Sequence, residues 1–250
     1  MVTTGTDEAL DHAERWFRDG LRVLQPALSV HQITVEMTQA LRRVEELRRT
    51  GVPASTTHLL VQAVARALAA NPGLHQIVAG TKRHRPETVD IGLSVSGESF
   101  VAPVLVLKSA DRKTVAEIAS EIAQRVPAAR KGDERFQRTL RRWGWLVPLG
   151  ILRRALLRLC YTSPSFRRRA GGTFQVSTTP TDWALTSTFA TAGVLVAGQV
   201  VSRVIVIDGQ AAVRPTMILT LSGDHGIWDG RAAARFLAAV RAELDMEHTA

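Results

Sequence analysis

The residues best placed to do chemistry lie near the carboxyl end, in the stretch Leu219-Thr-Leu-Ser-Gly-Asp-His225-Gly-Ile-Trp-Asp229-Gly230. An apolar strand ends just before His225, so an imidazole suited to proton transfer near neutral pH would project from a rigid support. Asp229 follows at the start of a helix, where free N–H groups and the helix dipole favour a carboxylate. Gly230 would allow a turn that a Cβ hinders. An isolated histidine before a helix is usually a surface or capping residue, but the spacing His-x-x-x-Asp-Gly favours a general base.

Other chemistries find weaker support in the sequence. Asp224, His225 and Asp229 form a poor set of metal ligands, because no second histidine or cysteine lies nearby, and we expect no metal. The glycine-rich stretches 92–97 and 171–172 lack the spacing of dinucleotide-binding or phosphate-binding loops. The sequence contains no Gly-x-Ser-x-Gly elbow, which argues against a serine hydrolase.

Composition narrows the class of protein. The 250 residues are 45% hydrophobic and 22% charged, which excludes wholesale disorder, a fibrous repeat and a polytopic membrane protein. The single cysteine, Cys160, cannot form an internal disulfide, and residues 1–7 do not resemble a signal peptide. We therefore expect a cytoplasmic protein.

The positive charge is concentrated in residues 131–170, where eleven basic residues accompany two acidic ones, so this segment alone accounts for the net charge of +9. It predicts a basic amphipathic helix or helical pair, interrupted at Pro148. Its longest uncharged run, 143–152, is about half of the ~20 residues that a membrane-spanning helix requires. The plainest interpretation is a helical flap with a solvated arginine face. Alternatives are attraction to an anionic membrane, an acidic carrier protein or the phosphates of a nucleotide-like donor. No pattern favours nucleic acid.

Periodicity and capping signals predict mixed helices and strands. We expect helices over about 7–24 (capped by Thr6), 38–51, 59–70, 112–125 (capped by Asp111) and 230–245, and strands over about 30–37, 89–95, 100–107, 174–178, 194–200, 204–207 and 213–222, with turns at 96–99 and 208–209. Because the two types do not alternate regularly, the pattern indicates one α+β domain with helices packed on a mixed sheet.

Four stretches, in order, resemble the catalytic domain of the dihydrolipoamide acyltransferase component of 2-oxoacid dehydrogenase complexes, and so chloramphenicol acetyltransferase. They are 59–72 (LLVQAVARALAANP), 89–95 with 101–105 (VDIGLSV, VAPVL), 171–177 (GGTFQVS) and 213–230 (VRPTMILTLSGDHGIWDG). Condensation domains and plant-type acyltransferases share the His-x-x-x-Asp spacing, but they are longer, two-lobed chains with the motif near the middle. The resemblance implies a chloramphenicol-acetyltransferase-like domain over residues 1–250, with a basic helical insertion at about 131–170.

The resemblance also implies roles for single residues. His225 would be the general base that takes a proton from an acceptor hydroxyl or thiol as this attacks an acyl thioester. Ser177 would donate a hydrogen bond to the tetrahedral oxyanion. Family members form trimers with the active site between subunits, so we expect a homotrimer in which His225 completes a neighbour's site.

Asp229 would be a structural member of the site together with Gly230. The resemblance pairs Asp229 with an arginine near the N-terminus, and Arg15 is preferred over Arg18 and Arg22.

The chain departs from the family at several points. Gly226 follows the motif histidine where an arginine is typical, Thr178 follows Ser177 where an asparagine is usual, and Trp228 is unusually bulky. There is no Asp-Lys-Ala lipoylation turn, so we expect no covalently attached lipoate. We expect a stand-alone acyltransferase that uses a coenzyme A thioester, foremost acetyl-CoA, and acylates a hydroxyl of a small molecule, with a tetronate-type natural-product intermediate as one candidate.

Two alternative functions and one binding role stay open. The chain would otherwise be a catalytic core acting with a separate lipoyl protein, or a non-catalytic scaffold whose basic segment binds a membrane or partner. Membrane-surface contact is the less favoured of these interpretations. Arg153, Arg154 and Arg158 are candidates for holding the phosphates of coenzyme A or docking an acyl carrier protein.

Overall fold

The computed structural model describes residues 10–23, 28–79, 82–95, 102–188 and 191–246, and one mixed sheet runs through them. Seven strands form this sheet in the order β1-β9-β7-β6-β4-β5, with β8 also paired to β9. The strands are β1 (Leu28–Glu36), β4 (Ile91–Ser94), β5 (Val104–Leu107), β6 (Phe174–Thr178), β7 (Gly193–Ala197), β8 (Val201–Ile207) and β9 (Gln210–Asp224). Strand β6 is parallel to β4 and β7, whereas β9 is antiparallel to β1, β7 and β8. The predicted mixed sheet is confirmed.

Three helices supply the apolar layer on the sheet: α2 (Thr38–Arg49), α3 (Thr56–Ala70) and α7 (Gly230–Asp245). Helix α3 is apolar on nearly every side and is buried along most of its length, packed against α7 and the sheet. Side chains of α3, α7 and the inward faces of β1, β7 and β9 form one continuous core. This layer fixes where the ends of β6 and β9 lie.

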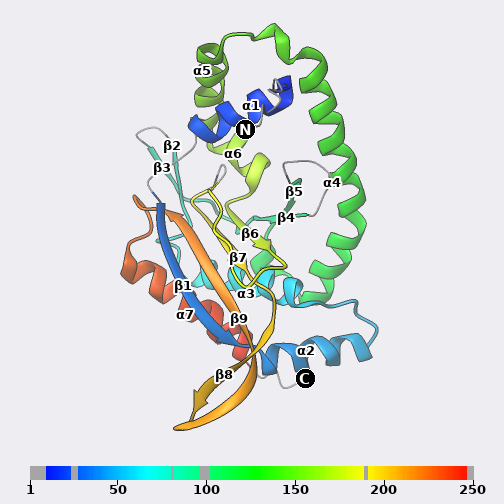
Figure 1. Ribbon diagram of the computed structural model, residues 1–250, viewed down its shortest axis with the longest axis vertical. Helices are drawn as coiled ribbons and strands as arrows, with labels where there is room; N and C mark the ends of the chain where they lie inside the picture. Colours follow the sequence, from blue (N-terminus) through cyan, green and yellow to red (C-terminus); the bar gives the residue numbers. More distant parts are fainter. Residues whose placement is uncertain (1–9, 24–27, 80–81, 96–101, 189–190, 247–250) are drawn as a thin grey trace, which may run out of the picture.

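A second group of helices rises away from the sheet. It consists of α1 (His12–Val23), α4 (Val115–Trp143), the short η2 (Gly144–Leu146) and α5 (Gly150–Tyr161), followed by α6 (Pro164–Gly171), which leads back to β6. Figure 1 shows α4 running up one side of the molecule, the chain turning over into α5, and α1 lying between them. We call α1, residues 131–143 of α4, η2 and α5 the crown. The helical pair broken around Pro148 is confirmed.

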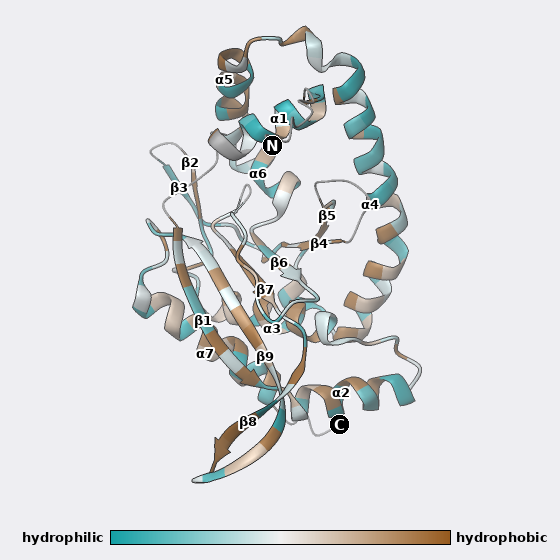
Figure 2. Cartoon of the chain, in the orientation of Figure 1, coloured by the Kyte–Doolittle hydropathy of each residue, from teal (hydrophilic) through white to brown (hydrophobic). Residues whose placement is uncertain are grey.

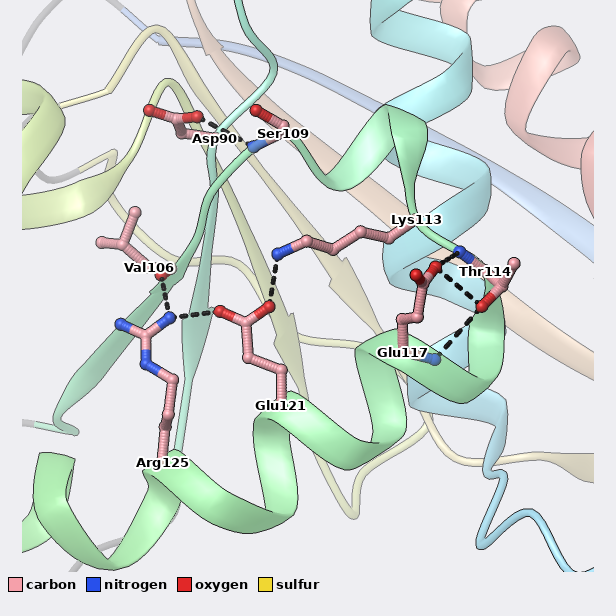
Figure 3. Close-up of polar contacts among 8 residues, drawn as sticks. All are labelled: Asp90, Val106, Ser109, Lys113, Thr114, Glu117, Glu121 and Arg125. Carbon is pink, nitrogen blue, oxygen red and sulfur yellow. Dashed lines mark hydrogen bonds and ion pairs between the residues drawn. The ribbon is translucent and has the colours of Figure 1, made fainter.

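Helix α4 is longer than predicted and starts at a different cap. Thr114, not Asp111, is the N-cap, because its hydroxyl accepts the N–H of Glu117 while the Glu117 carboxylate accepts the N–H of Thr114 (Figure 3). The helix continues past Arg125 and through Pro127 to Trp143. Proline removes one hydrogen bond, but packing of the upper half of α4 against α1 holds the helix together.

The first turns of α4 are tied to the neighbouring strand by charged side chains. Glu121 binds both Lys113 and Arg125, and the Arg125 guanidinium donates to the carbonyl of Val106 in β5 at 3.0 Å (Figure 3). Burial alone would raise the pKa of Glu121, but these two cations hold it below its ordinary value. The base of α4 is therefore fixed to the sheet.

Several smaller expectations can be compared with the structure. The turn at Asp208-Gly209 is confirmed, with positive φ at both residues. Strand β7 ends at Ala197 rather than Val200, and the hairpin of β2 (Ile77–Ala79) and β3 (Lys82–His84) was not predicted. The expected cap Thr6 and the expected turn at 96–99 lie outside the described residues. Within the described part of the chain, no helix is both long and apolar enough to cross a bilayer.

Candidate functional site

His225 is the first residue after β9 and is exposed, as the sequence predicts. The turn that carries it is fixed by Asp224. The Asp224 carboxylate accepts the N–H of Gly226 at 2.9 Å, and its carbonyl accepts the N–H groups of Ile227 at 2.8 Å and Trp228 at 2.9 Å. The imidazole therefore stands on a rigid loop with open space beside it, and no Cβ on Gly226 crowds it.

Trp228 anchors this loop in the core. Its side chain is fully buried, and its ring lies 5.8 Å from that of Phe174 and 5.1 Å from that of Phe236. The glycine that this packing requires is Gly223, because a Cβ there would come within 2.6 Å of the Trp228 ring. The bulk of Trp228 thus has a structural reason that the sequence did not give.

The expected role of Gly230 is wrong. A Cβ at Gly230 would lie 3.8 Å from His31, an ordinary contact, because this residue is already the first of α7. Glycine is not needed there for the turn.

Asp229 is the N-cap of α7. Its carboxylate accepts the N–H of Ala232 at 2.7 Å, as its place beside a helix start predicts. Arg15 instead donates to the carbonyl of Leu10 at 2.9 Å on the crown helix α1. The expected Arg15–Asp229 pair is therefore not formed within the chain, where Asp229 binds the N–H of Ala232 instead.

Ser177 is half-buried near the end of β6, and a close backbone contact fixes that strand. A Cβ on Gly92 would lie 2.2 Å from the carbonyl oxygen of Gly171, and a Cβ on Gly172 would lie 2.5 Å from that of Asp90. Gly172 also has a φ of +75°, which favours glycine. Gly92 and Gly172 therefore let the start of β6 lie against β4, which sets the position of Ser177.

A buried polar cluster reinforces the same junction. The Asp90 carboxylate accepts hydrogen bonds from Arg168 at 2.8 Å, Thr88 at 3.0 Å and the N–H of Ser109 at 3.1 Å. Burial alone would raise the pKa of Asp90, but these donors, Arg168 foremost, hold it below its ordinary value. The charge is balanced, so the cluster ties α6 to β4.

His75 is the uncharged member of this junction. Its Nε2 lies 2.8 Å from the hydroxyl of Thr173, the residue before β6. Burial, with a smaller contribution from Arg168, lowers the pKa of His75 to about 4. This histidine is therefore neutral at physiological pH, and neither this cluster nor its role was predicted from the sequence.

Within one chain, Ser177 and His225 do not meet. Ser177 pairs with Val196 of β7, and Val196 pairs with Thr220 of β9. His225 lies five residues beyond Thr220 along β9 and two strands away from Ser177. At a rise of about 3.3 Å per residue and about 4.8 Å between strands, the two side chains are separated by roughly 20 Å. Hydrogen bonding to one reacting centre would require the two to come from different copies.

A pocket of about 180 Å³ opens beside the end of β6, on the side of α3. Thr178 and Thr179, which follow Ser177, line it together with Thr56 and Thr57 at the start of α3 and with residues 197–200. Because its walls come from separate segments of the chain, the sequence offers no signal that would find it. Leu60 and Met217 also line it, so its walls present both hydroxyl groups and apolar side chains.

The arginines expected to hold phosphates differ in their surroundings. Arg153 and Arg154 both bind the carboxylate of Asp19, at 2.8 and 3.0 Å, whereas Arg158 is exposed. Two of the three candidates therefore already have an acidic partner. Among the described residues, no group of three or more His, Cys, Asp or Glu side chains is arranged to hold a metal ion.

Comparison with known proteins covers most of the chain. Residues 25–138 and 189–249 match the family model of the 2-oxoacid dehydrogenases acyltransferase (catalytic domain). The succinyltransferase component of the 2-oxoglutarate dehydrogenase complex of Bartonella vinsonii is 26% identical over 239 residues, covering 92% of this chain and 50% of the relative. The lipoamide acyltransferase component of the branched-chain alpha-keto acid dehydrogenase complex of Bacillus subtilis is 29% identical over 190 residues, covering 74% and 38%. The chain thus spans half or less of these relatives.

Solved structures agree with the fold. A probable dihydrolipoamide acetyltransferase from Listeria monocytogenes has a TM-score of 0.76 at 23% identity, covering 100% of this chain and 99% of that one. The dihydrolipoamide acetyltransferase of Azotobacter vinelandii has a TM-score of 0.73 at 20% identity, covering 97% and 92%. A chloramphenicol acetyltransferase has a TM-score of 0.52 at 17% identity, covering 96% and 98%. The expected chloramphenicol-acetyltransferase-like fold is confirmed.

Proposed function

This chain belongs to the 2-oxoacid dehydrogenases acyltransferase (catalytic domain) family, and we propose that it transfers an acyl group from a thioester to a nucleophile, with His225 as the general base. The observation that carries the proposal is the strand-end histidine on a loop fixed by Asp224 and anchored by Trp228, inside the segment that matches the family model. A fixed, exposed imidazole suits proton transfer near neutral pH.

The proposed reaction balances with one shuttled proton. The His225 imidazole takes the proton of the acceptor hydroxyl or thiol, whose oxygen or sulfur attacks the thioester carbonyl carbon. The carbonyl oxygen becomes an oxyanion, and the Ser177 hydroxyl donates a hydrogen bond to it. Collapse of the intermediate breaks the carbon–sulfur bond, and the leaving thiolate takes the proton back from the imidazolium. The products are the acylated acceptor and a free thiol.

The site would be completed between copies of the chain. Ser177 and His225 are roughly 20 Å apart in one chain by strand spacing, so we propose that His225 of one copy works with Ser177 of another, in a homotrimer. The Azotobacter vinelandii acetyltransferase is similar in fold, and its structure comes from a study of a serine, a histidine and an asparagine in its catalytic mechanism. In that protein the asparagine lies four residues after the histidine. The corresponding spacing here places Asp229 at the third position, where it caps α7.

We further propose that the acyl donor is acetyl-CoA and that the acceptor is a hydroxyl of a small molecule. We also propose that residues 1–250 form a single catalytic domain. Gly226 places no side chain directly after His225, and the imidazole is exposed, so an acceptor hydroxyl can reach it. A hydroxyl group as acceptor, including a tetronate-type intermediate, remains our prediction.

A second candidate is acyl transfer with a separate lipoyl protein. The names of the relatives favour it, since they are lipoamide or dihydrolipoyllysine-residue acyltransferases. In that case, the acceptor or donor would be a thiol of dihydrolipoamide rather than a hydroxyl.

Thiol release from acetyl-CoA tests both candidates. The purified chain is incubated with acetyl-CoA and either dihydrolipoamide or the small-molecule fraction of a cell extract, and labelled acetyl products are identified. Labelled ester from the extract supports the hydroxyl acceptor, and labelled acetyl-dihydrolipoamide alone supports the lipoyl candidate. If neither acceptor, nor a panel of longer acyl thioesters, gives thiol release above that of a His225→Ala variant, acyl transfer by this chain is contradicted.

A further inference from the structure

In helix α5 of the crown, arginine side chains face the rest of the molecule and apolar side chains face outward, the reverse of an ordinary amphipathic helix. Arg153 is only 8% exposed, and its guanidinium donates to Asp19 at 2.8 Å and to the carbonyls of Val147 and Pro148 at 2.9 and 2.8 Å. Arg154 donates to the other oxygen of Asp19 at 3.0 Å. Burial alone would raise the pKa of Asp19, but the two arginines hold it below its ordinary value. The orientation of α5 is therefore fixed by a buried ionic contact.

The apolar side chains consequently point away from the molecule. The exposed fractions are 73% for Ile151, 68% for Leu159, 61% for Leu149, 58% for Leu146, 54% for Trp145 and 52% for Leu152. These residues lie on η2, on the connection after it and on α5, where the crown projects farthest from the sheet, and Figure 2 shows hydrophobic colour along α5. The expectation of a solvated arginine face over a packed apolar face is wrong for this helix.

Exposed cations accompany this apolar surface. Arg138, Arg142 and Arg158 are exposed, and no ion pair to them occurs among the described residues. The Arg142 guanidinium lies over the Trp143 ring at 5.2 Å, an arrangement that keeps an aromatic side chain and a cation together at the surface. At the crown, Asp11 pairs with Arg141 and Asp19 pairs with Arg153 and Arg154, so basic residues there outnumber their carboxylate partners.

We propose that the crown binds the surface of an anionic lipid bilayer, with the apolar side chains of η2 and α5 in the interfacial layer and the exposed arginines on the headgroups. A bilayer supplies both partners, because its interface accepts apolar side chains to a depth of about 5–10 Å and its anionic headgroups attract basic residues. Crown-to-crown contact between two copies would instead oppose two surfaces of the same charge. This inference goes beyond acyl transfer, and a binding measurement tests it without any measurement of activity.

Flotation with vesicles tests the proposal on the full chain. Vesicles of phosphatidylcholine alone are compared with an equal mixture of phosphatidylcholine and phosphatidylglycerol. The wild-type chain is expected to float with the mixed vesicles and to bind them less at high salt, since exposed charges are screened. Binding to the neutral vesicles is expected to be weaker.

Matched variants separate the apolar from the ionic contribution. Trp145→Ser with Leu152→Ser should abolish most flotation, whereas Trp183→Ser with Leu185→Ser should not, although these control side chains are 54% and 52% exposed, as the first pair is. Changing Arg138, Arg142 and Arg158 to Gln should weaken binding to the mixed vesicles about fivefold per residue. The same change at the exposed Arg42, Arg214 and Arg235 should have a much smaller effect.

Three results would overturn the proposal. One is equal binding of the wild-type chain to neutral and anionic vesicles, and another is equal loss in the crown and control pairs. The third is an absence of flotation combined with an oligomer that the Trp145→Ser, Leu152→Ser variant dissociates, because this would make the crown an interface between copies. Circular dichroism of each variant shows that it is folded.

Discussion

The sheet region and the crown each contain a buried aspartate paired with an arginine, but they differ in where their apolar side chains lie. In the sheet region, the buried Asp90 pairs with the partly exposed Arg168 at a junction that positions β6, and apolar residues lie in the core. In the crown, Asp19 and Arg153 are also buried as a pair, but the pair displaces leucine and isoleucine outward. A buried ion pair therefore accompanies a covered apolar core in the sheet region and an exposed apolar surface in the crown.

The two regions also differ in how tightly the backbone is packed. The sheet contains glycines at which a Cβ would collide with neighbouring backbone, as at Gly92 and Gly172, because the strands that position Ser177 approach closely. In the crown half of α4, a Cβ on Gly132 would meet no neighbouring atom within 4 Å. The crown also has a crowded glycine, Gly144, whose Cβ would lie 2.9 Å from that of His12, but the neighbour there is a side chain rather than backbone.

The largest effect is expected at His225, on the sheet side of this comparison. His225→Ala should lower kcat/KM for acyl transfer by about 10²–10⁴, because the nucleophile loses its base. Since His225 is exposed, the thermal midpoint and the size of the assembly should stay unchanged. His84→Ala, which removes another exposed histidine, is the control. A wild-type rate in the His225 variant would refute the assignment of the base.

Removing the carboxylate of Asp19 should break the crown. Asp19→Ala leaves the Arg153 guanidinium buried without its acidic partner, a change that typically costs about 3–5 kcal/mol. Hydrogen exchange in residues 145–161 should accelerate, while exchange in β9 stays slow. Asp182→Ala is the matched control, because its carboxylate is exposed and its ion pair with Arg203 should contribute little to stability. Equal protection of the crown in both variants would contradict the account.

A pH effect should identify the buried histidine of the sheet junction. The pKa of His75 falls from 6.5 to about 4 on folding. As the pH is lowered, this histidine is therefore protonated in the unfolded chain before it is protonated in the folded chain. Its contribution to stability is complete above pH 6.5 and is lost progressively toward pH 4, by about 3 kcal/mol. His75→Asn removes this share. Denaturant unfolding of both proteins across this range checks the difference, and parallel curves would contradict it. The pKa of His58 is lowered in the same direction by burial and Arg48, so the variant should keep a residual slope.

Alanine substitution at one glycine in each region should change the free energy of unfolding in opposite directions. Gly92→Ala places a Cβ 2.2 Å from the carbonyl oxygen of Gly171 and should destabilise the fold by about 1–3 kcal/mol. Gly132→Ala meets open space within α4 and should stabilise it by about 1 kcal/mol. Chemical denaturation measures both. A destabilised Gly132 variant or an unaffected Gly92 variant would break the comparison of packing.

Local sequence signals predicted the strands, turns and caps that depend on residues close together in the chain. The apolar run of β9, the Asp208-Gly209 turn and the Asp229 cap were all visible as patterns. The end of α4 was not, because Pro127 is a strong local stop signal that packing against α1 overrides.

Long-range contacts account for what the sequence did not reveal. The need for glycine at Gly223 depends on Trp228, and the outward face of α5 depends on Asp19, which lies more than 130 residues away in the chain. Composition showed that residues 131–170 are basic and apolar, but only the contact between Asp19 and Arg153 decides which of the two faces outward.

Mixing two inactive variants tests the central claim, that His225 and Ser177 of different copies form one site. His225→Ala and Ser177→Ala chains are purified separately, unfolded together in equal amounts and refolded, and acyl transfer is compared with that of each variant refolded alone. The account predicts recovery of about a quarter of wild-type activity, because random assembly gives that share of interfaces an intact histidine and serine. Activity no greater than that of the separate variants, in assemblies shown to contain both chains, would contradict it.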